Sequence, residues 1–233
     1  QGKEPFILKR NESYIGVMID DIVTKGTLEP YRLLSSRAEY RLLLRHDNAD
    51  VRLTPYGYKL GLISEERYQK FLKKNENVEK AIEILSKIHL GSSKRVNDYL
   101  SSKGFETLKA GVSGVELFKR PEIHYENICD LVPEIKEIEL DFNGIAQLEI
   151  SVKYEGYIKR ELNEANSFAK FENYSIPEGI DYLNMHGLAL EARQKLDKIR
   201  PTTVGQAGRI SGINPADISI LILNLKRMAK WNF

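Results

Sequence analysis

The most chemically distinctive stretch of the sequence is an arginine-rich segment near its beginning. Between residues 32 and 52 arginine occurs five times and lysine does not occur, although the chain has 35 lysines and arginines in total. A guanidinium group is planar, always charged and able to bind two phosphate oxygens at once, and it also stacks on nucleobases. Exclusive use of arginine therefore indicates a phosphate-rich ligand such as an RNA backbone. The candidate ligand-binding residues are Arg32, Arg37, Arg41, Arg45 and Arg52.

The spacing of these arginines predicts that a helix presents them. Ser35 or Ser36 is expected to begin a helix that runs to about Arg45. Four residues advance a helix by about 400°, which leaves a shift of only ~40°. Arg37 and Arg41 would then share one face with Arg45, and the two flanking arginines could converge on the same side.

A structural network is the alternative interpretation of the segment. Glu39, Asp47 and Asp50 lie within the same stretch and could pair with the arginines internally. The adjacent acids Asp20 and Asp21 project to different sides of either a helix or a strand, so we expect a cap or a domain-junction role for them rather than a catalytic pair. No catalytic residue is predicted in this chain.

The C-terminal stretch "TVGQAGRISGINPADISILIL" is a second candidate site. It could form a DNA-binding helix-turn-helix, but such a motif places polar side chains at the start of its second helix. Here that helix begins with proline, alanine, aspartate and isoleucine, and favours a protein surface instead. It would pack in its own bundle or dock a partner protein. The candidate partner-binding residues are Arg193, Arg209, Ser211, Asp217 and Ile218.

Composition limits the classes of function that remain. The 233 residues are 42% apolar with a net charge of +2, so any surface that binds nucleic acid must be a local patch. The single cysteine, Cys129, excludes an intrachain disulfide, fits a reducing cytosol and is expected to be a buried small apolar residue. No apolar run reaches the roughly 20 residues of a membrane span. The four histidines lack metal-ligand spacing, so no metal is expected.

The elements that position these residues are expected to be helices, with little or no sheet. Residues 13–26 form a helix or a buried strand. Residues 143–171 alternate like a strand in part, but one long helix with a weak point at Gly156 is favoured. Further helices are expected over residues 54–61, 64–91, 93–102, 113–119, 187–198, 203–211 and 215–230. The fold class is mainly α and multi-helical, ending in a small helical bundle.

Two blocks of the sequence resemble a known family. "EPFILKRNESYIGVMIDDIVTKGTLEPYRLLSSRAEYRLLLRHDNADVRLT" resembles the tRNA uridine 5-carboxymethylaminomethyl modification flavoproteins, formerly called the glucose-inhibited division protein A family. The stretch "GLALEARQKLDKIRPTTVGQAGRISGINPADISILIL" resembles the C-terminal region of the same family, and "KYEGYIKRE" between them is similar to it as well.

The resemblance implies a cytoplasmic, homodimeric FAD-dependent enzyme that acts with a partner GTPase. Together they would install the 5-carboxymethylaminomethyl group on wobble uridine 34 of tRNA, with NADH, a methylenetetrahydrofolate-derived carbon and glycine or ammonium. The arginine-rich segment becomes a tRNA-contact candidate, and the C-terminal helices become a candidate dock for the GTPase. The alternative is a non-enzymatic helical scaffold whose arginines form internal networks.

This sequence departs from the full pattern of the family. It has no Gly-x-Gly-x-x-Gly fingerprint, and Cys129 lies outside both similar blocks, so the family's catalytic-cysteine role does not transfer to it. We therefore expect the C-terminal portion of the enzyme, without redox activity by itself. Three domains are expected: a junction to the flavin domain over residues 1–57, a helical domain over 58–172 and a helical bundle over 173–233.

Overall fold

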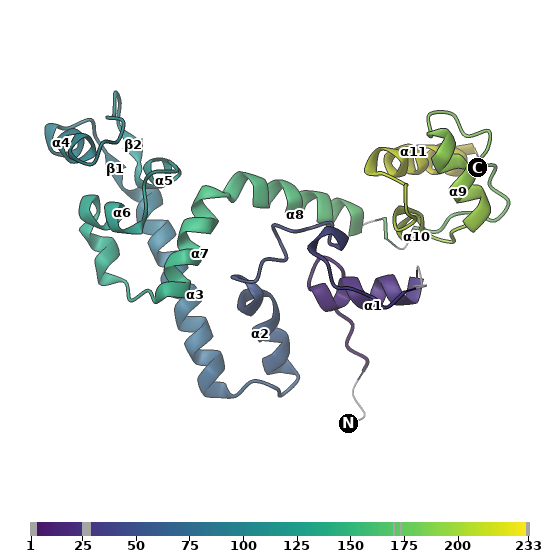
Figure 1. Ribbon diagram of the computed structural model, residues 1–233, viewed down its shortest axis with the longest axis horizontal. Helices are drawn as coiled ribbons and strands as arrows, with labels where there is room; N and C mark the ends of the chain where they lie inside the picture. The colour runs from purple at the N-terminus through teal and green to yellow at the C-terminus, as the bar shows by residue number, and fades with distance from the viewer. Residues whose placement is uncertain (1–3, 25–28, 170, 173, 232–233) are drawn as a thin grey trace. The chain divides into compact units, whose positions relative to one another are not determined.

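The computed structural model describes residues 4–24, 29–169, 171–172 and 174–231 of the chain, which is drawn in Figure 1. Its contacts divide it into two compact units. We call residues 42–159 the central unit, and residues 1–41 together with 160–233 the terminal unit. This division rests on contacts between residues and does not test the three expected domains, so their boundaries stay a prediction.

The central unit is built from short and long helices with one small hairpin. Its strands β1 and β2 pair antiparallel, with His89 opposite Ser113 and Leu90 opposite Val112. Its elements are α2 (Ala49–Lys59), α3 (Glu65–Lys87), β1 (His89–Leu90), α4 (Lys94–Ser102), β2 (Val112–Ser113), α5 (Gly114–Phe118), α6 (Tyr125–Leu131), η2 (Pro133–Glu137) and α7 (Phe142–Lys153).

The long helix α3 forms the axis of this unit, and α2, α5 and α7 pack against it. The Ser64 hydroxyl caps its first turn by accepting a hydrogen bond from the backbone N–H of Arg67 at 3.3 Å. Val78, Ala81 and Leu85 recur at helical spacing and are buried in the core. The helix expected over 64–91 is thus confirmed, although it ends four residues early because the chain turns into β1.

Cys129 lies in this core and is only 4% exposed. Burial raises the pKa of its thiol, because the charged thiolate loses solvation away from water. The interpretation of Cys129 as a buried small residue is confirmed.

The terminal unit combines the first helix of the chain with a C-terminal bundle. Its elements are α1 (Tyr14–Thr24), the short 3-10 helix η1 (Ser35–Arg37), the greater part of α8 (Glu155–Ala169), α9 (Leu190–Ile199), α10 (Val204–Gly208) and α11 (Pro215–Trp231). The bundle core contains Leu196 and Leu221, and the loop before α9 adds Ile176 and Tyr182 to it. The expected small helical bundle is confirmed.

The start of α11 shows why this part of the fold was predictable. The side chain of Asn214 accepts a hydrogen bond from the Asp217 N–H at 2.9 Å, and the Asp217 carboxylate accepts one from the Asn214 N–H at 3.2 Å. This reciprocal cap satisfies N–H groups that have no partner within the helix.

The helix expected over 35–45 is wrong. Only Ser35–Arg37 forms a 3-10 turn, and Ala38 is extended, with φ −89° and ψ 127°. The physical reason is a long-range contact: the Arg10 guanidinium donates to the backbone carbonyl of Arg37 at 3.3 Å. That carbonyl would otherwise have accepted a bond from the N–H of Arg41 in a helix.

Two other expected boundaries are also corrected. The helix predicted to open at Thr54 begins at Ala49, so that Pro55 lies inside α2. The Arg52 guanidinium stabilises this earlier start by donating to the Asn48 side chain and to the carbonyl of Arg45, both at 2.9 Å. The segment 143–171 is helical rather than extended, but it is interrupted at Tyr154 and forms two helices, α7 and α8.

The remaining helices follow the sequence pattern closely, and the class is mainly α with one two-stranded sheet among the described residues. Within the segment 13–26, Tyr14–Thr24 forms a helix rather than a strand, and the expected end at Gly26 lies outside the described residues. Helix α6 and the hairpin were not predicted. None of the helices in the described ranges is long and apolar enough to cross a lipid bilayer.

Gly16 in α1 should be intolerant of any side chain. A Cβ at this position would lie 2.3 Å from the carbonyl oxygen of Lys9 and 2.6 Å from that of Leu8, both backbone atoms. We expect Gly16→Ala to lower the free energy of unfolding by about 2 kcal/mol. Gly156→Ala is the matched control, because its Cβ would meet no atom within 4 Å. It should raise stability by about 0.5–1 kcal/mol through better helix propensity.

Urea titrations followed by circular dichroism measure both changes. Equal stability of Gly16→Ala and the unmodified chain would contradict the packing described for α1.

Candidate functional site

Three of the candidate arginines lie exposed in the terminal unit. The Arg37 guanidinium stacks over the ring of Tyr31, with its central carbon 4.5 Å from the ring centroid, and its side chain is 40% exposed. One of its nitrogens lies 3.9 Å from the buried carboxylate of Asp21, at the outer limit of an ion pair. Arg37 is therefore oriented by an aromatic ring while its charge still faces solvent.

Arg32 and Arg41 are also exposed. Among the described residues, neither guanidinium makes a hydrogen bond or an ion pair. The nearby acid Glu39, which could have neutralised Arg41, binds Arg10 instead, at 2.6 Å. These two side chains keep their full charge available for an external anion.

Arg45 and Arg52 belong to the central unit and are used internally. Arg45 pairs with the Asp47 carboxylate at 3.1 Å, donates to the carbonyl of Leu42 and is 17% exposed. Arg52 holds the first turn of α2 as described above, so these two arginines fix the turn between residues 42 and 52. The expected single row of guanidiniums on one helix face is not formed, because the helix that would carry it is absent.

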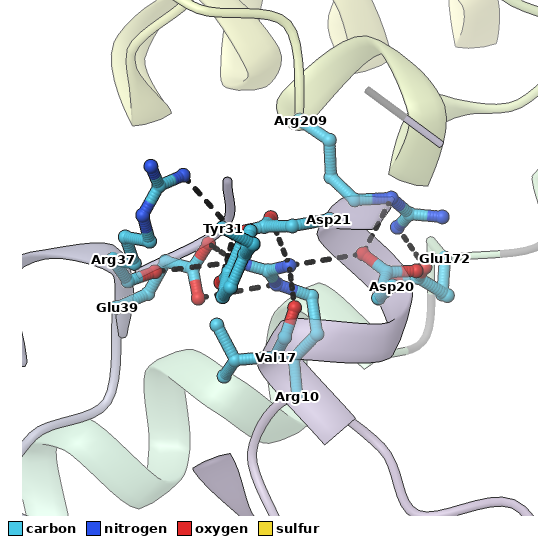
Figure 2. A network of polar contacts seen from close by, with 9 residues as sticks. All are labelled: Arg10, Val17, Asp20, Asp21, Tyr31, Arg37, Glu39, Glu172 and Arg209. Atoms are coloured by element: carbon cyan, nitrogen blue, oxygen red, sulfur yellow. Dashed lines mark hydrogen bonds and ion pairs between the residues drawn. The ribbon is translucent and has the colours of Figure 1, made fainter. Parts of the chain in front are cut away.

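Arg10 is the centre of a network of polar contacts in the terminal unit, and it was not among the residues predicted from the sequence (Figure 2). Its Nη1 lies 2.7 Å from Asp21 Oδ1 and 3.0 Å from Asp20 Oδ2, and donates to the carbonyl of Val17 at 3.3 Å. Its Nε and Nη2 donate to the two carboxylate oxygens of Glu39, at 3.2 Å and 2.6 Å. One guanidinium thus joins α1 to the chain around residues 37–39.

The charge state of this centre follows from its partners. Burial by itself would lower the pKa of Arg10, but the hydrogen bonds and charges of Glu39 and Asp21 outweigh burial and raise it, so Arg10 stays protonated. The pKa of Tyr31 is raised by burial and by its hydrogen bond to Asp21 at 2.9 Å. Burial, reinforced by the charge of Glu39, raises the pKa of Tyr40 to about 12. Both phenols are therefore neutral at neutral pH.

A second arginine of the network, Arg209, ties the C-terminal bundle to α1 within the terminal unit (Figure 2). Its Nε lies 3.1 Å from Asp20 Oδ2 as an ion pair, although the angle does not make a hydrogen bond, and its Nη1 binds Glu172. The side chain is 13% exposed. Arg209, a candidate partner-binding residue, therefore faces the interior of the terminal unit. Asp20 thus links sequence-distant segments of one unit, and a domain-junction role for Asp20 and Asp21 stays a prediction.

The other candidate partner-binding residues are also mostly internal. Arg193 donates to the carbonyls of Leu188 and Leu183, at 2.9 Å and 3.3 Å, and closes the loop before α9. Asp217 and Ile218 are each 4% exposed, one as a cap of α11 and the other in the bundle core. Ser211 is the exposed member of the set.

The signal for Arg10 in the sequence is weak. It precedes α1 rather than lying on it, so no helical periodicity relates it to Asp20 and Asp21. The only sequence signal is the adjacent pair of acids, Asp20 and Asp21, which indicates that a cation lies close to them in space.

Among the residues that the structure describes, no group of three His, Cys, Asp or Glu side chains could hold a metal ion. The same residues form a single two-stranded antiparallel sheet, with no parallel strand that leads through a glycine-rich turn into a helix. They therefore do not provide the usual dinucleotide-binding arrangement.

Comparison with known proteins gives two family matches. Residues 65–162 match the family described as tRNA modifying enzyme MnmG/GidA C-terminal helical domain, and residues 164–232 match tRNA modifying enzyme MnmG/GidA C-terminal helical bundle.

Individual relatives agree with these matches. The chain is 54% identical over 226 residues to the tRNA uridine 5-carboxymethylaminomethyl modification enzyme MnmG of Geobacillus kaustophilus, an alignment that covers 97% of this chain and 36% of the relative. It is 50% identical over 230 residues to the enzyme of the same name from Caldicellulosiruptor saccharolyticus, covering 99% and 36%. A solved structure of Aquifex aeolicus GidA matches with a TM-score of 0.63 and 40% identity, covering 96% of this chain and 34% of that one. The chain thus spans about a third of the length of its relatives.

Removing the Arg10 guanidinium should destabilise the terminal unit. Arg10→Met keeps much of the side-chain volume but withdraws the cation that lies 2.7 Å from Asp21, whose side chain is 3% exposed. We expect a loss of about 3 kcal/mol in the free energy of unfolding, because a buried carboxylate is left without that partner.

Arg32→Met, at an exposed position, is the control and should change stability by no more than about 0.5 kcal/mol. Thermal unfolding measures both variants. Similar melting temperatures for the two would show that the Arg10 network does not hold this unit together.

Proposed function

The chain belongs to the MnmG/GidA family of tRNA-modifying enzymes, whose C-terminal region it matches, and on this premise we propose that it docks tRNA for the longer enzyme. The relatives are named for 5-carboxymethylaminomethyl modification of tRNA uridine. The proposed enzyme installs this group on wobble uridine 34, and this chain supplies binding rather than chemistry.

One observation carries the tRNA proposal. Arg32, Arg37 and Arg41 lie within ten residues of one another and are all exposed in the terminal unit. Two acids near them, Glu39 and Asp21, each bind Arg10. Each contact with a phosphate releases a condensed counterion from the RNA, which favours binding at low salt. Arg45 and Arg52 contribute to the proposal indirectly, by fixing the turn that follows.

Redox chemistry is assigned to the part of the enzyme outside this chain. The described residues do not fit a dinucleotide, so no step through FAD is derived from them. The resemblance supports FAD as the cofactor, NADH and methylenetetrahydrofolate as co-reactants, a homodimer and a cytoplasmic location, and these remain part of the proposal.

A second proposed task is docking of the tRNA-modification GTPase by the C-terminal bundle. The support for this task is the family resemblance, together with large apolar side chains that the bundle exposes. Leu190 in α9 is 68% exposed, and Leu223 in α11 is 50% exposed. Because Asp217 and Ile218 are buried, the proposed contact uses these leucines and Ser211 instead.

The competing function is a scaffold without a role in RNA binding. The scaffold interpretation expects arginines that bind groups within the chain. Five arginines do so: Arg10, Arg45, Arg52, Arg193 and Arg209. The exposed arginines are what distinguish the two functions, and they provide the test.

We expect the chain to bind a tRNA transcript with an affinity that falls steeply as salt rises. Arg41→Ala and Arg32→Ala should each reduce the slope of log affinity against log salt by about one, because each removes one phosphate contact. Arg67→Ala, an exposed arginine of α3 outside the segment, is the charge-matched control and should leave the slope unchanged. Fluorescence anisotropy over a salt series measures all three variants. If the chain does not bind tRNA, or if neither arginine substitution changes the slope, the scaffold function is favoured.

Docking of the GTPase is tested by pull-down with the purified partner. Leu223→Lys should weaken capture by about tenfold or more, because a lysine would place a charge in an apolar contact. Ser101→Lys, at an exposed position in α4 of the central unit, adds the same charge away from the bundle and should retain capture. If both variants capture the GTPase as well as the unmodified chain does, the bundle is not its docking surface.

A further inference from the structure

Two tyrosines stand out on the surface of the central unit, where α7 ends and α8 begins. Tyr154 is 48% exposed and Tyr157 is 63% exposed, and these are the most exposed tyrosines among the described residues. Their rings contact each other, with centroids 6.5 Å apart and planes inclined at 51°. An exposed aromatic pair is unusual, because a buried tyrosine ring contributes substantially to stability.

The local fold does not require these rings. The backbone at the junction is already satisfied: the Tyr154 N–H donates to the carbonyl of Ile150 at 3.0 Å, and its own carbonyl accepts from Ile158 at 2.9 Å. The apolar face of α7 that stabilises the unit is formed by Leu148 and Val152, which are buried. Within the described ranges, neither tyrosine hydroxyl makes a hydrogen bond. The pair therefore has unused stacking faces and unused polar tips.

The charges around the pair favour an anionic partner. Glu155, the acid between the two tyrosines, is neutralised by Lys119 at 2.8 Å. Arg160 and Glu161 lie three and four residues after Tyr157 on α8, and Glu161 makes an interaction of its own. Arg160 is exposed, and its guanidinium has no partner among the described residues. Lys159 beside it is exposed as well.

We propose that Tyr154 and Tyr157 form a stacking platform for an unpaired base of the bound RNA. This inference rests on the proposed tRNA-docking function and names a second contact, distinct from the arginine-rich segment. Every nucleobase has an aromatic face, so stacking suits bases in a loop or at an end, which are not paired within a helix. A protein partner would need a broader apolar surface than two rings flanked by charged residues.

Loss of stacking and loss of charge change RNA binding in different ways, the first through affinity alone and the second also through the salt slope. Tyr157→Ala should weaken binding of a short single-stranded RNA by about tenfold, because base–aromatic stacking is lost. The salt slope should not change, since no phosphate contact is removed. Tyr157→Phe keeps the ring and should restore affinity. Leu162→Ala, at a similarly exposed position of α8, is the control and should bind as the unmodified chain does.

The direct measurement uses 2-aminopurine as the base analogue in the single-stranded RNA. Its fluorescence should be quenched on binding to the unmodified chain and to Tyr157→Phe, and much less so with Tyr154→Ala combined with Tyr157→Ala. Fully paired RNA should bind the double variant as well as it binds the unmodified chain, because its bases are already stacked. Circular dichroism verifies that each variant is folded.

The outcomes separate this inference from the function on which it rests. If the unmodified chain does not bind tRNA, both are overturned. If tRNA binding follows the arginine substitutions but not the tyrosine substitutions, only the stacking platform is overturned. Loss of GTPase capture by Tyr157→Ala, with RNA binding intact, would identify a protein contact and would likewise overturn it.

Discussion

A single, partly buried guanidinium organises the terminal unit. Arg10 binds Asp20 and Asp21 at the end of α1, and Glu39 in the following segment, so one cation contacts three carboxylates. Three acids so close together would repel one another without it. Asp20 in turn meets Arg209 of the C-terminal bundle, which extends the same network across sequence-distant parts of this unit. The position of the arginine-rich segment depends on this arrangement.

The same interaction decides which arginines can meet a ligand. Because Arg10 takes Glu39 and the carbonyl of Arg37, Ala38 is extended, and Arg41 makes no ion pair among the described residues. Arg45 instead lies next to Asp47 in a tight turn and is neutralised there. Arginines that look equivalent in the sequence thus divide into exposed cations and internal braces. The physical basis of this division is whether a nearby carboxylate is already bound by another cation.

The sequence allowed the helical class, most helices and the buried role of Cys129 to be predicted, because caps and apolar periodicity are local signals. Ser64 and Asn214 mark helix starts that the structure contains. The helix over 35–45 failed since its competitor, a bond from Arg10, spans 27 residues and leaves no local pattern. The same holds for the candidate site: residue types indicated a cationic surface, but the exposure of each guanidinium depends on partners brought together only by folding.

The single thiol of the chain has a practical consequence. Cys129 is enclosed in the central core, and the protonated form of its sulfur is favoured there, so an alkylating reagent in water will find little reactive thiolate. A cysteine placed at an exposed site such as Ser211 would then accept a maleimide dye almost alone. The native chain is thereby a ready background for site-specific fluorescent labelling of its C-terminal bundle, without prior removal of its own sulfhydryl.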